Sequence, residues 1–228
     1  MGERPFDGLF IDFYGTIAAG DREAVEATCL RIVEACGLPI APPDFAVTWG
    51  ARYFATVARS NHQAFRTLYE CELVSLHDTL AAFGQFPDPA PFLVDLEEYW
   101  HNPPVHEDAI EFLREVRLPT CCVSNADTKP LLAAIGRHRL RFDAVISSEA
   151  VRCYKPDPVI FHHALSALGL RPDRVMHVGD SLHSDIAGAA GAGIAATWIR
   201  REDRIHDIGE YKPWRTVTRL SQLRDLLA

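Results

Sequence analysis

The sequence predicts an α/β protein: a doubly wound, Rossmann-like parallel sheet with an all-helical domain inserted after the first strand. After Pro104, short apolar runs alternate with segments of helical length, which is typical of a parallel sheet covered by helices on both faces. Residues 21–100 instead show helical periodicity throughout, which indicates a separate helical domain. We therefore expect residues 1–16 and 105–228 to form the sheet domain, and residues 17–104 to form the helical lobe.

The expected elements follow one another in a simple order. The first strand is the apolar run from Gly8 to Tyr14, and Asp12 stands near its carboxyl end. Breaks rich in glycine and proline divide the inserted segment into about four helices. The remaining elements are a helix near 106–116, a strand at 119–123, a helix near 127–138, a strand at 142–146, a helix at 158–168, a strand at 175–178, a helix at 184–192 and a strand at 194–199.

Length, composition and charge narrow the class of protein. A chain of 228 residues with 48% hydrophobic residues can bury one substantial core and add a smaller domain. The net charge of -8 disfavours a nucleic-acid partner, and a small anionic substrate would need local positive charge. No apolar run approaches the ~20 residues of a membrane span, so we expect no membrane association and a cytoplasmic location. The six cysteines contain no C-x-x-C pair and are expected to be reduced, mostly buried thiols. Whether the protein is a monomer or a homodimer stays open.

Polar side chains gather at the carboxyl ends of four expected strands or just past them. The stretches are Asp12–Thr16, Ser124–Asn125, Lys155–Pro156 and Gly179–Asp185. In an open α/β sheet the carboxyl ends of the strands meet at one edge, so these groups are expected to converge there. Three carboxylates would supply the hard oxygen ligands that Mg²⁺ prefers. Hydroxyl groups could hold the oxygens of a transferring group, and a lysine could offset its charge. The side chains concerned are Asp12, Asp180, Asp185, Thr16, Ser124, Asn125 and Lys155.

In this order and at this spacing, the four stretches resemble the signature motifs of the haloacid dehalogenase superfamily. The resemblance covers the whole chain and implies that Asp12 is a covalent nucleophile. It implies that Ser124 is the second-motif hydroxyl and Lys155 the third-motif lysine. Asp180 and Asp185 would then be the fourth-motif acids that hold Mg²⁺. The helical lobe would be the cap domain that closes over the site and selects the substrate.

The sequence departs from the phosphatases of that superfamily at Tyr14. These enzymes usually carry a second aspartate there, which protonates the leaving group and activates the incoming water. A phenol with a pKa near 10 is a poor base at neutral pH, although the backbone carbonyl of Tyr14 could still coordinate Mg²⁺ as the family implies. The pattern Asp-x-Tyr-Gly-Thr is similar to the 2-haloacid dehalogenase branch, whose halide leaves without a proton. Asp180 favours the phosphatases, because metal-independent dehalogenases tend to have a small hydroxyl residue at its position.

Three functions therefore stay open. The main expectation is a Mg²⁺-dependent phosphatase that acts on a small phosphorylated metabolite. Its leaving group would depart without an acid, or the cap would bring a proton donor. The alternatives are a carbon–halogen hydrolase of the 2-haloacid dehalogenase type, and a binding protein with impaired catalysis. The residues expected to contact substrate are Tyr14, Arg52, Arg59, His62 and His183.

Overall fold

The computed structural model describes residues 6–202 and 211–224, and its centre is a parallel β-sheet. Within the described residues the strand order is β3-β2-β1-β4-β5-β6, so the direction of winding reverses at β1. This arrangement confirms the predicted doubly wound, Rossmann-like sheet. The strands are β1 (Gly8–Ile11), β2 (Thr120–Ser124), β3 (Ala144–Ser147), β4 (Val175–Gly179), β5 (Ala195–Ile199) and β6 (Arg215–Val217).

Helices cover both faces of the sheet because side chains along each buried strand alternate between the two faces. In β1, Leu9 and Ile11 join one apolar cluster, and Phe10 joins the other. The first cluster contains side chains of α5 (Glu107–Glu115), α6 (Thr128–Arg137) and the 3₁₀-helix η5 (Leu220–Leu223). The second contains side chains of α8 (Val159–Leu168), the π-helix η4 (Leu182–Ala187) and α9 (Gly188–Gly191). The short helix α7 (Ser148–Val151) follows β3, and the 3₁₀-helix η3 (Pro172–Arg174) precedes β4.

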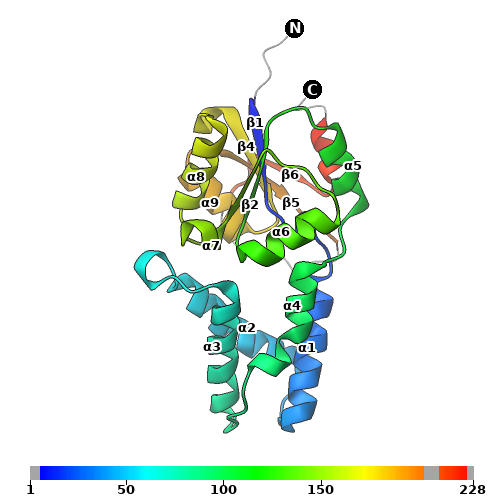
Figure 1. Cartoon of the computed structure of the whole chain (residues 1–228), viewed down its shortest axis with the longest axis vertical. Coiled ribbons are helices and arrows are strands. Elements are labelled where there is room, and N and C mark those ends of the chain that lie inside the picture. Colours follow the sequence, from blue (N-terminus) through cyan, green and yellow to red (C-terminus); the bar gives the residue numbers. More distant parts are fainter. Residues whose placement is uncertain (1–5, 203–210, 225–228) are drawn as a thin grey trace.

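The inserted segment forms a helical lobe beyond the carboxyl edge of the sheet (Figure 1). It has its own apolar cluster, in which Phe45, Trp49 and Leu76 are buried. Its two connections to the sheet domain lie side by side, since Ala18 and Val105 form an antiparallel bridge. The domain boundaries near 17 and 104 stay predictions. The helices are α1 (Asp21–Cys36), α2 (Pro42–Ala58), α3 (Leu68–Ala82) and α4 (Val94–His101), with 3₁₀-helices η1 (His62–Ala64) and η2 (Ala90–Phe92).

The structure differs from the expected elements at several places, among them the three that follow. Strand β1 ends at Ile11, so Asp12 lies just beyond the strand. The helix expected at 184–192 consists of the π-helix η4 followed by α9. Strand β6 was not predicted, because it has three residues at the edge of the sheet and the first two are exposed.

Two expectations from composition can be compared with the structure. All six cysteines are free, and five of them are buried, as expected for reduced thiols. No helix in residues 6–202 or 211–224 has the length and apolarity needed to span a bilayer.

Candidate active site

The register of two neighbouring strands brings the first and fourth sequence stretches together. Ile11 of β1 pairs with Val178 of β4, and the backbone N–H of Asp12 donates a hydrogen bond to the Val178 carbonyl oxygen (2.9 Å). Asp12 therefore leaves β1 directly beside Gly179, the last residue of β4. This is the position where the strand order reverses, and doubly wound sheets bind their ligands in the crevice outside that point.

Three aspartates form a compact acidic cluster at this edge. Ligand oxygens of Asp12, Asp180 and Asp185 all lie within 4.8 Å of one another. All three residues are buried, with relative exposures of 5%, 3% and 1%. Gly179 is needed for this approach, because a Cβ atom at that position would lie 2.1 Å from Cγ of Asp185. The backbone N–H of Ser181 also donates to Asp185 Oδ2 (3.0 Å), which fixes that carboxylate at the start of η4.

Lys155 joins two of the carboxylates. Its Nζ atom lies 2.7 Å from Asp12 Oδ1 and 2.6 Å from Asp185 Oδ1. A third hydrogen bond, to the Val123 carbonyl oxygen (3.0 Å), uses the remaining proton of the ammonium group. Asn125 positions this lysine, because its side chain accepts from Lys155 N (2.7 Å) and donates to Lys155 O (3.1 Å).

The buried charges set the protonation states within this group. Burial raises the pKa of Asp12, and the positive charge of Lys155 only partly opposes that effect. Burial would also raise the pKa of Asp185, but the positive charge of Lys155 and the hydrogen bond from His177 outweigh it and hold the pKa well below its usual range. The pKa of Lys155 is raised despite its burial, since the charges of Asp12 and Asp185 favour the ammonium form.

The two hydroxyl residues lie where the sequence placed them. Ser124 Oγ donates to Asp12 Oδ1 (3.4 Å). Thr16 Oγ1 donates to Asp180 Oδ1 (3.4 Å). The four stretches chosen from the sequence therefore meet in one buried group, while the chemical role of each residue stays a prediction.

Two buried residues near the site were missed from the sequence. His177 lies in β4, and its Nε2 atom is 2.8 Å from Asp185 Oδ1. The sequence did offer one indication of His177, because an ionisable residue is unusual inside an otherwise apolar strand. Arg201 follows β5 and donates through Nη2 to the Thr16 carbonyl oxygen (2.8 Å) and through Nη1 to Asp108 Oδ1 (2.8 Å). Nothing in the local sequence connects Arg201 with the loop after β1.

The acidic cluster is chemically suited to a divalent cation. Three carboxylates stand beside a single ammonium group, and Asp12 Oδ2 is buried without a hydrogen-bond partner among the described residues. Such an orphaned buried oxygen is costly unless a ligand satisfies it. Carboxylate oxygens are the ligands that Mg²⁺ prefers. The donor set therefore fits Mg²⁺, and coordination by the Tyr14 carbonyl stays a prediction.

The phenol of Tyr14 connects the sheet domain with the helical lobe. Its hydroxyl donates to the carbonyl oxygen of Trp100 (2.6 Å), at the end of α4. Its ring lies 5.0 Å from the ring of Phe13 and 5.9 Å from that of Tyr99. Burial raises the pKa of Tyr14 further above its usual range. The phenol is therefore a weak candidate for the proton donor that phosphatases place at this position.

The other residues expected to contact substrate have different surroundings. Arg52 is half-buried on α2 and donates to the Thr48 carbonyl oxygen of its own helix (3.4 Å). Arg59 is exposed at the end of α2, and His183 is exposed on η4. His62 pairs with Asp157 of the sheet domain at 3.0 Å. Contact between these residues and a substrate stays a prediction.

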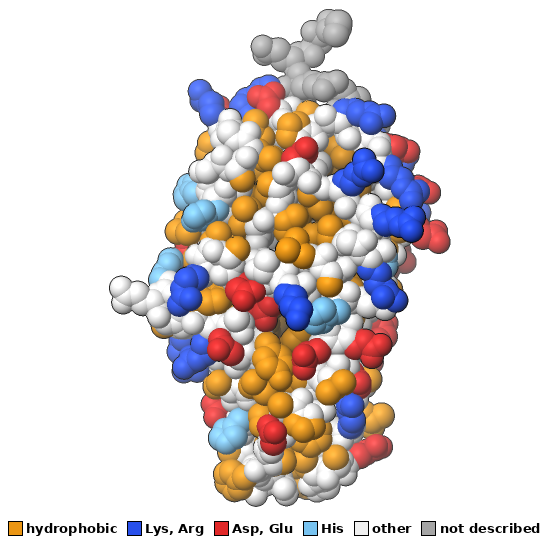
Figure 2. Space-filling model, in the orientation of Figure 1, with side chains coloured by type: hydrophobic (Ala, Val, Ile, Leu, Met, Phe, Trp, Pro, Cys, Tyr) orange, Lys and Arg blue, Asp and Glu red, His pale blue; other side chains and the backbone are white. Residues whose placement is uncertain are grey.

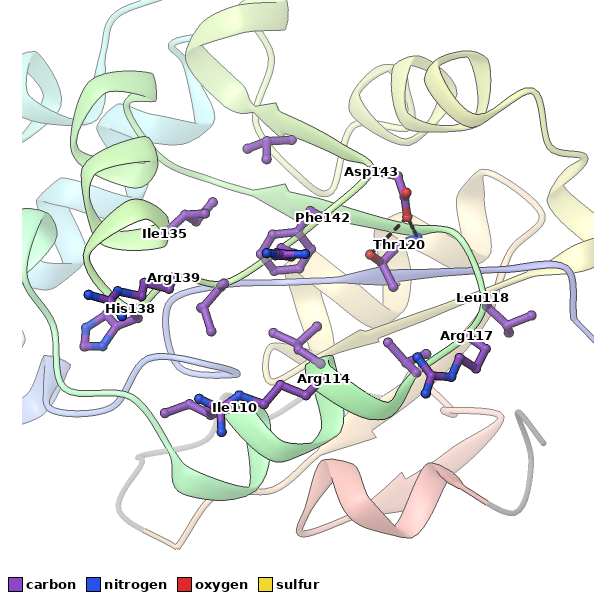
Figure 3. A pocket seen from close by; sticks show the side chains of 15 residues that line it. Ile110, Arg114, Arg117, Leu118, Thr120, Ile135, His138, Arg139, Phe142 and Asp143 are labelled. Carbon is purple, nitrogen blue, oxygen red and sulfur yellow. Dashed lines mark hydrogen bonds between the residues drawn. The ribbon is translucent and has the colours of Figure 1, made fainter.

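A large surface hollow of the sheet domain lies away from the acidic cluster. In Figure 2, hydrophobic side chains reach the surface in the middle of this domain, with several lysines and arginines nearby. The hollow of Figure 3 is lined by α5, α6 and the chain before β3, including Arg114, Arg139 and Phe142. Thr120 at the start of β2 and Asp143 just before β3 place it at the amino edge of the sheet. It is therefore not the crevice in which Asp12 lies.

Three buried carboxylates and a buried lysine lie together at the carboxyl edge of a doubly wound sheet and form the candidate active site. Residues 6–193 match the model of the haloacid dehalogenase-like hydrolase family, and the chain belongs to that family. It is 25% identical to (S)-2-haloacid dehalogenase H-109 of Pseudomonas putida over 98% of this chain and 99% of that protein. It is 41% identical to a pyrimidine 5'-nucleotidase of Escherichia coli, over 38% of each protein. The L-2-haloacid dehalogenase structure from Xanthobacter autotrophicus has the same fold, with a TM-score of 0.78, 21% identity and coverage of 98% and 100%.

Proposed function

We propose that this hydrolase is a Mg²⁺-dependent phosphatase that acts on a small phosphorylated metabolite. The observation that carries the proposal is the third carboxylate, Asp180, beside Asp12 and Asp185. Three buried acids with one lysine have excess negative charge, which a divalent cation would offset. Similarity to a pyrimidine 5'-nucleotidase adds support from a relative whose name describes a phosphate-ester substrate.

The residues suit a two-step hydrolysis. Lys155 and Ser124 hold Asp12 Oδ1, which leaves Oδ2 as the carboxylate oxygen available for attack. In the first step an Asp12 oxygen forms a bond to phosphorus, and the bond from phosphorus to the leaving oxygen breaks. In the second step water attacks the aspartyl phosphate and releases phosphate and free Asp12. When bound by Asp12, Asp180 and Asp185, Mg²⁺ would offset the negative charge of the phosphoryl group.

A 2-haloacid dehalogenase is the second candidate, and the environment of Tyr14 favours it. The Tyr14 hydroxyl donates its hydrogen bond to the Trp100 carbonyl oxygen. This position therefore supplies no free acid to protonate an alkoxide leaving group. A halide needs no proton, so attack of Asp12 on the substrate carbon would release it directly. Hydrolysis of the resulting ester would follow as in the first candidate. The match to (S)-2-haloacid dehalogenase H-109 extends over almost the whole of both chains.

The identity of the released product, phosphate or chloride, distinguishes the two candidate functions. The phosphatase should release phosphate from p-nitrophenyl phosphate with Mg²⁺, and lose that activity with EDTA or with Asp12→Asn. A dehalogenase should release chloride from 2-chloropropionate with or without EDTA, and again lose activity with Asp12→Asn. Asp173→Asn is the matched control, because Asp173 is exposed and pairs with Arg171 far from the site. Chloride release that is unaffected by EDTA, with no phosphate release, would refute the first proposal. A protein without either activity would fit the binding-protein alternative.

A further inference from the structure

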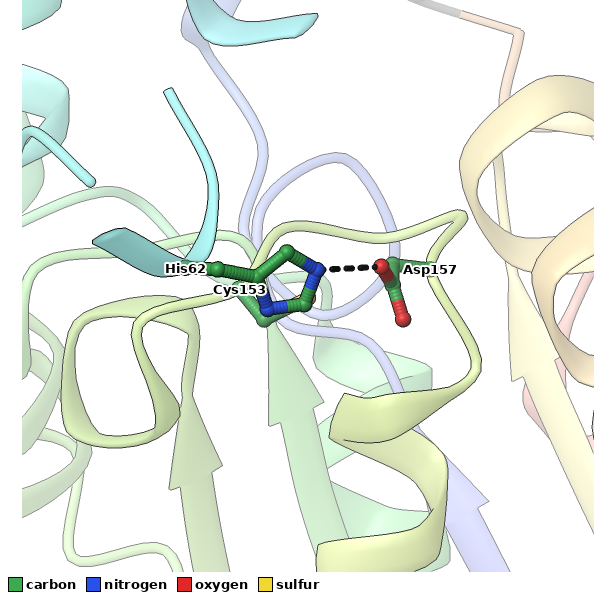
Figure 4. A group of neighbouring side chains, drawn as sticks. All are labelled: His62, Cys153 and Asp157. Atoms are coloured by element: carbon green, nitrogen blue, oxygen red, sulfur yellow. Dashed lines mark hydrogen bonds and ion pairs between the residues drawn. The ribbon is translucent and has the colours of Figure 1, made fainter. Parts of the chain in front are cut away.

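A second group of metal-binding side chains lies between the helical lobe and the sheet domain. His62 belongs to the segment between α2 and α3, and Cys153 and Asp157 belong to the loop between α7 and α8 (Figure 4). A ring nitrogen of His62, the Cys153 sulfur and a carboxylate oxygen of Asp157 all lie within 4.8 Å of one another. The imidazole Nε2 is 3.0 Å from Asp157 Oδ2.

The backbone holds His62 against this loop. The N–H of His62 donates to the Arg152 carbonyl oxygen (2.8 Å), and Asn61 Oδ1 accepts from Tyr154 N (2.7 Å). His62 has a φ of 54°, in the left-handed region that a residue with a side chain rarely adopts. This conformation is unfavourable for a residue with a Cβ atom. His62 has this backbone conformation at the point where its imidazole lies close to the Cys153 sulfur and the Asp157 carboxylate.

The donor set differs from that of the acidic cluster. One thiol, one imidazole and one carboxylate match the ligands of Zn²⁺ and related thiophilic cations, with water as the fourth ligand. Mg²⁺ prefers oxygen ligands alone. Cys153 is fully buried, whereas 56% of the His62 side chain is exposed. A cation could therefore enter from the His62 side and meet the thiol behind it.

We propose that His62, Cys153 and Asp157 form a binding site for a thiophilic divalent cation of the Zn²⁺ class. Binding forms a metal–sulfur bond and releases the thiol proton of Cys153 to water. Because His62 comes from the helical lobe, the bound cation ties that lobe to the sheet domain. Cys153 and Asp157 stand two residues on either side of Lys155, so occupancy also holds the loop that carries this lysine. Occupancy therefore stabilises the contact between the helical lobe and the sheet domain.

The test uses the full-length protein with Co²⁺ and Zn²⁺ alone as probes. Co²⁺ should produce a thiolate-to-cobalt charge-transfer band, and one equivalent of Zn²⁺ should abolish it. His62→Ala and Asp157→Asn should each weaken Zn²⁺ binding at least about tenfold, since even residues behind metal ligands are worth 10- to 100-fold. Cys153→Ser should remove the band. Zn²⁺ should raise the melting temperature of the original protein but not that of His62→Ala.

Two controls make the result specific. His77→Ala removes a histidine that is similarly exposed (55%) and lies 3.3 Å from Asp78, and it should leave the band unchanged. Asp180→Asn alters the acidic cluster and should also leave the band unchanged. Failure to see a cobalt–thiolate band, or a band that survives in His62→Ala, would overturn the proposal. His62 is exposed, so its replacement tests the site even if Cys153→Ser fails to fold.

Discussion

Nζ of Lys155 lies 2.7 Å from Oδ1 of Asp12, and both residues are buried at the carboxyl edge of the sheet. The two come from stretches 143 residues apart in the chain. The lysine holds one oxygen of the expected nucleophile and leaves the other without a hydrogen-bond partner among the described residues. This geometry orients the carboxylate and neutralises part of its charge before any substrate arrives.

Replacement of Lys155 by methionine should strongly destabilise the protein. Asp12 and Asp185 would lose the cation that both contact, and breaking a buried ion pair from one side costs about 3–5 kcal/mol. Urea unfolding measures this change in the free energy of unfolding. Lys129→Met, on the exposed start of α6, is the control and should have little effect. A loss at Lys155 no larger than that of the control would contradict the proposed electrostatic role.

Replacement of Tyr14 by aspartate should accelerate hydrolysis of phosphate esters with poor leaving groups. An aspartate would supply the missing acid and base, and such assistance is typically worth about 10²- to 10⁴-fold. The expected gain is at least about tenfold for an alkyl phosphate, and smaller for p-nitrophenyl phosphate. Tyr14→Phe is the control, because it removes the hydrogen bond to Trp100 without adding an acid. Equal rates for the two variants would argue against a phosphatase that lacks only this group.

Replacement of Gly179 by alanine should disturb the acidic cluster. The new methyl group would meet Cγ of Asp185 at 2.1 Å, so the loop or the carboxylate must move. Overpacking of this kind typically costs about 1–3 kcal/mol. Urea unfolding and phosphate release should both report the change. Gly191→Ala is the matched control, because a Cβ atom there meets nothing within 4 Å, and its stability should be unchanged or higher.

Local sequence patterns were enough to predict the sheet and the position of the candidate active site, because both depend on short-range features of the sequence. Each buried strand is largely an apolar run. Asp12 and Asp180 directly follow such strands, whereas Lys155 lies beyond β3 and α7. Parallel strands place their carboxyl ends together, so Asp12, Lys155 and Asp180 could be assigned to one edge without coordinates. The edge strand β6 was not predicted, because a three-residue strand that is mostly exposed has little apolar pattern.

Contacts between distant segments could not be predicted in this way. Asp127 illustrates the reason, because it stands immediately before α6 (Thr128–Arg137). In the structure its side chain makes no capping hydrogen bond to α6. Its oxygens instead accept from Leu68 N (2.7 Å) and Tyr69 N (3.0 Å) at the start of α3. The choice between these two helices depends on lobe packing, which no local pattern encodes.

Replacement of Asp127 by alanine should loosen the helical lobe from the sheet domain. Two backbone N–H groups of α3 would lose their acceptor, and the helix would lose a favourable negative charge at its amino end. The expected cost is about 1–2 kcal/mol. Hydrogen exchange of the first turn of α3 and urea unfolding measure it. Thr67→Ala provides the comparison, since Thr67 caps the same helix from within the lobe. It should destabilise α3 without releasing the contact with the sheet domain.

The stability of the helical lobe should depend on pH through Glu72. Burial of this residue of α3 raises its pKa to about 8. The folded state therefore holds a proton that the unfolded chain releases near its usual pKa of 4.5. The stability contributed by the protonated carboxyl is complete below that value and is lost as the pH rises through about 8.

Glu72→Gln should remove this loss, because the amide keeps the shape of the side chain and carries no charge. Its free energy of unfolding should be close to that of the original protein at about pH 4, and higher than that of the original protein at about pH 9. Urea unfolding at both pH values measures the difference. Glu98→Gln, on the exposed side of α4, is the control and should follow the original protein at both pH values. If Glu72→Gln follows the original protein as well, the carboxyl is already ionised in the folded lobe, and its environment is more hydrated than its burial on α3 implies.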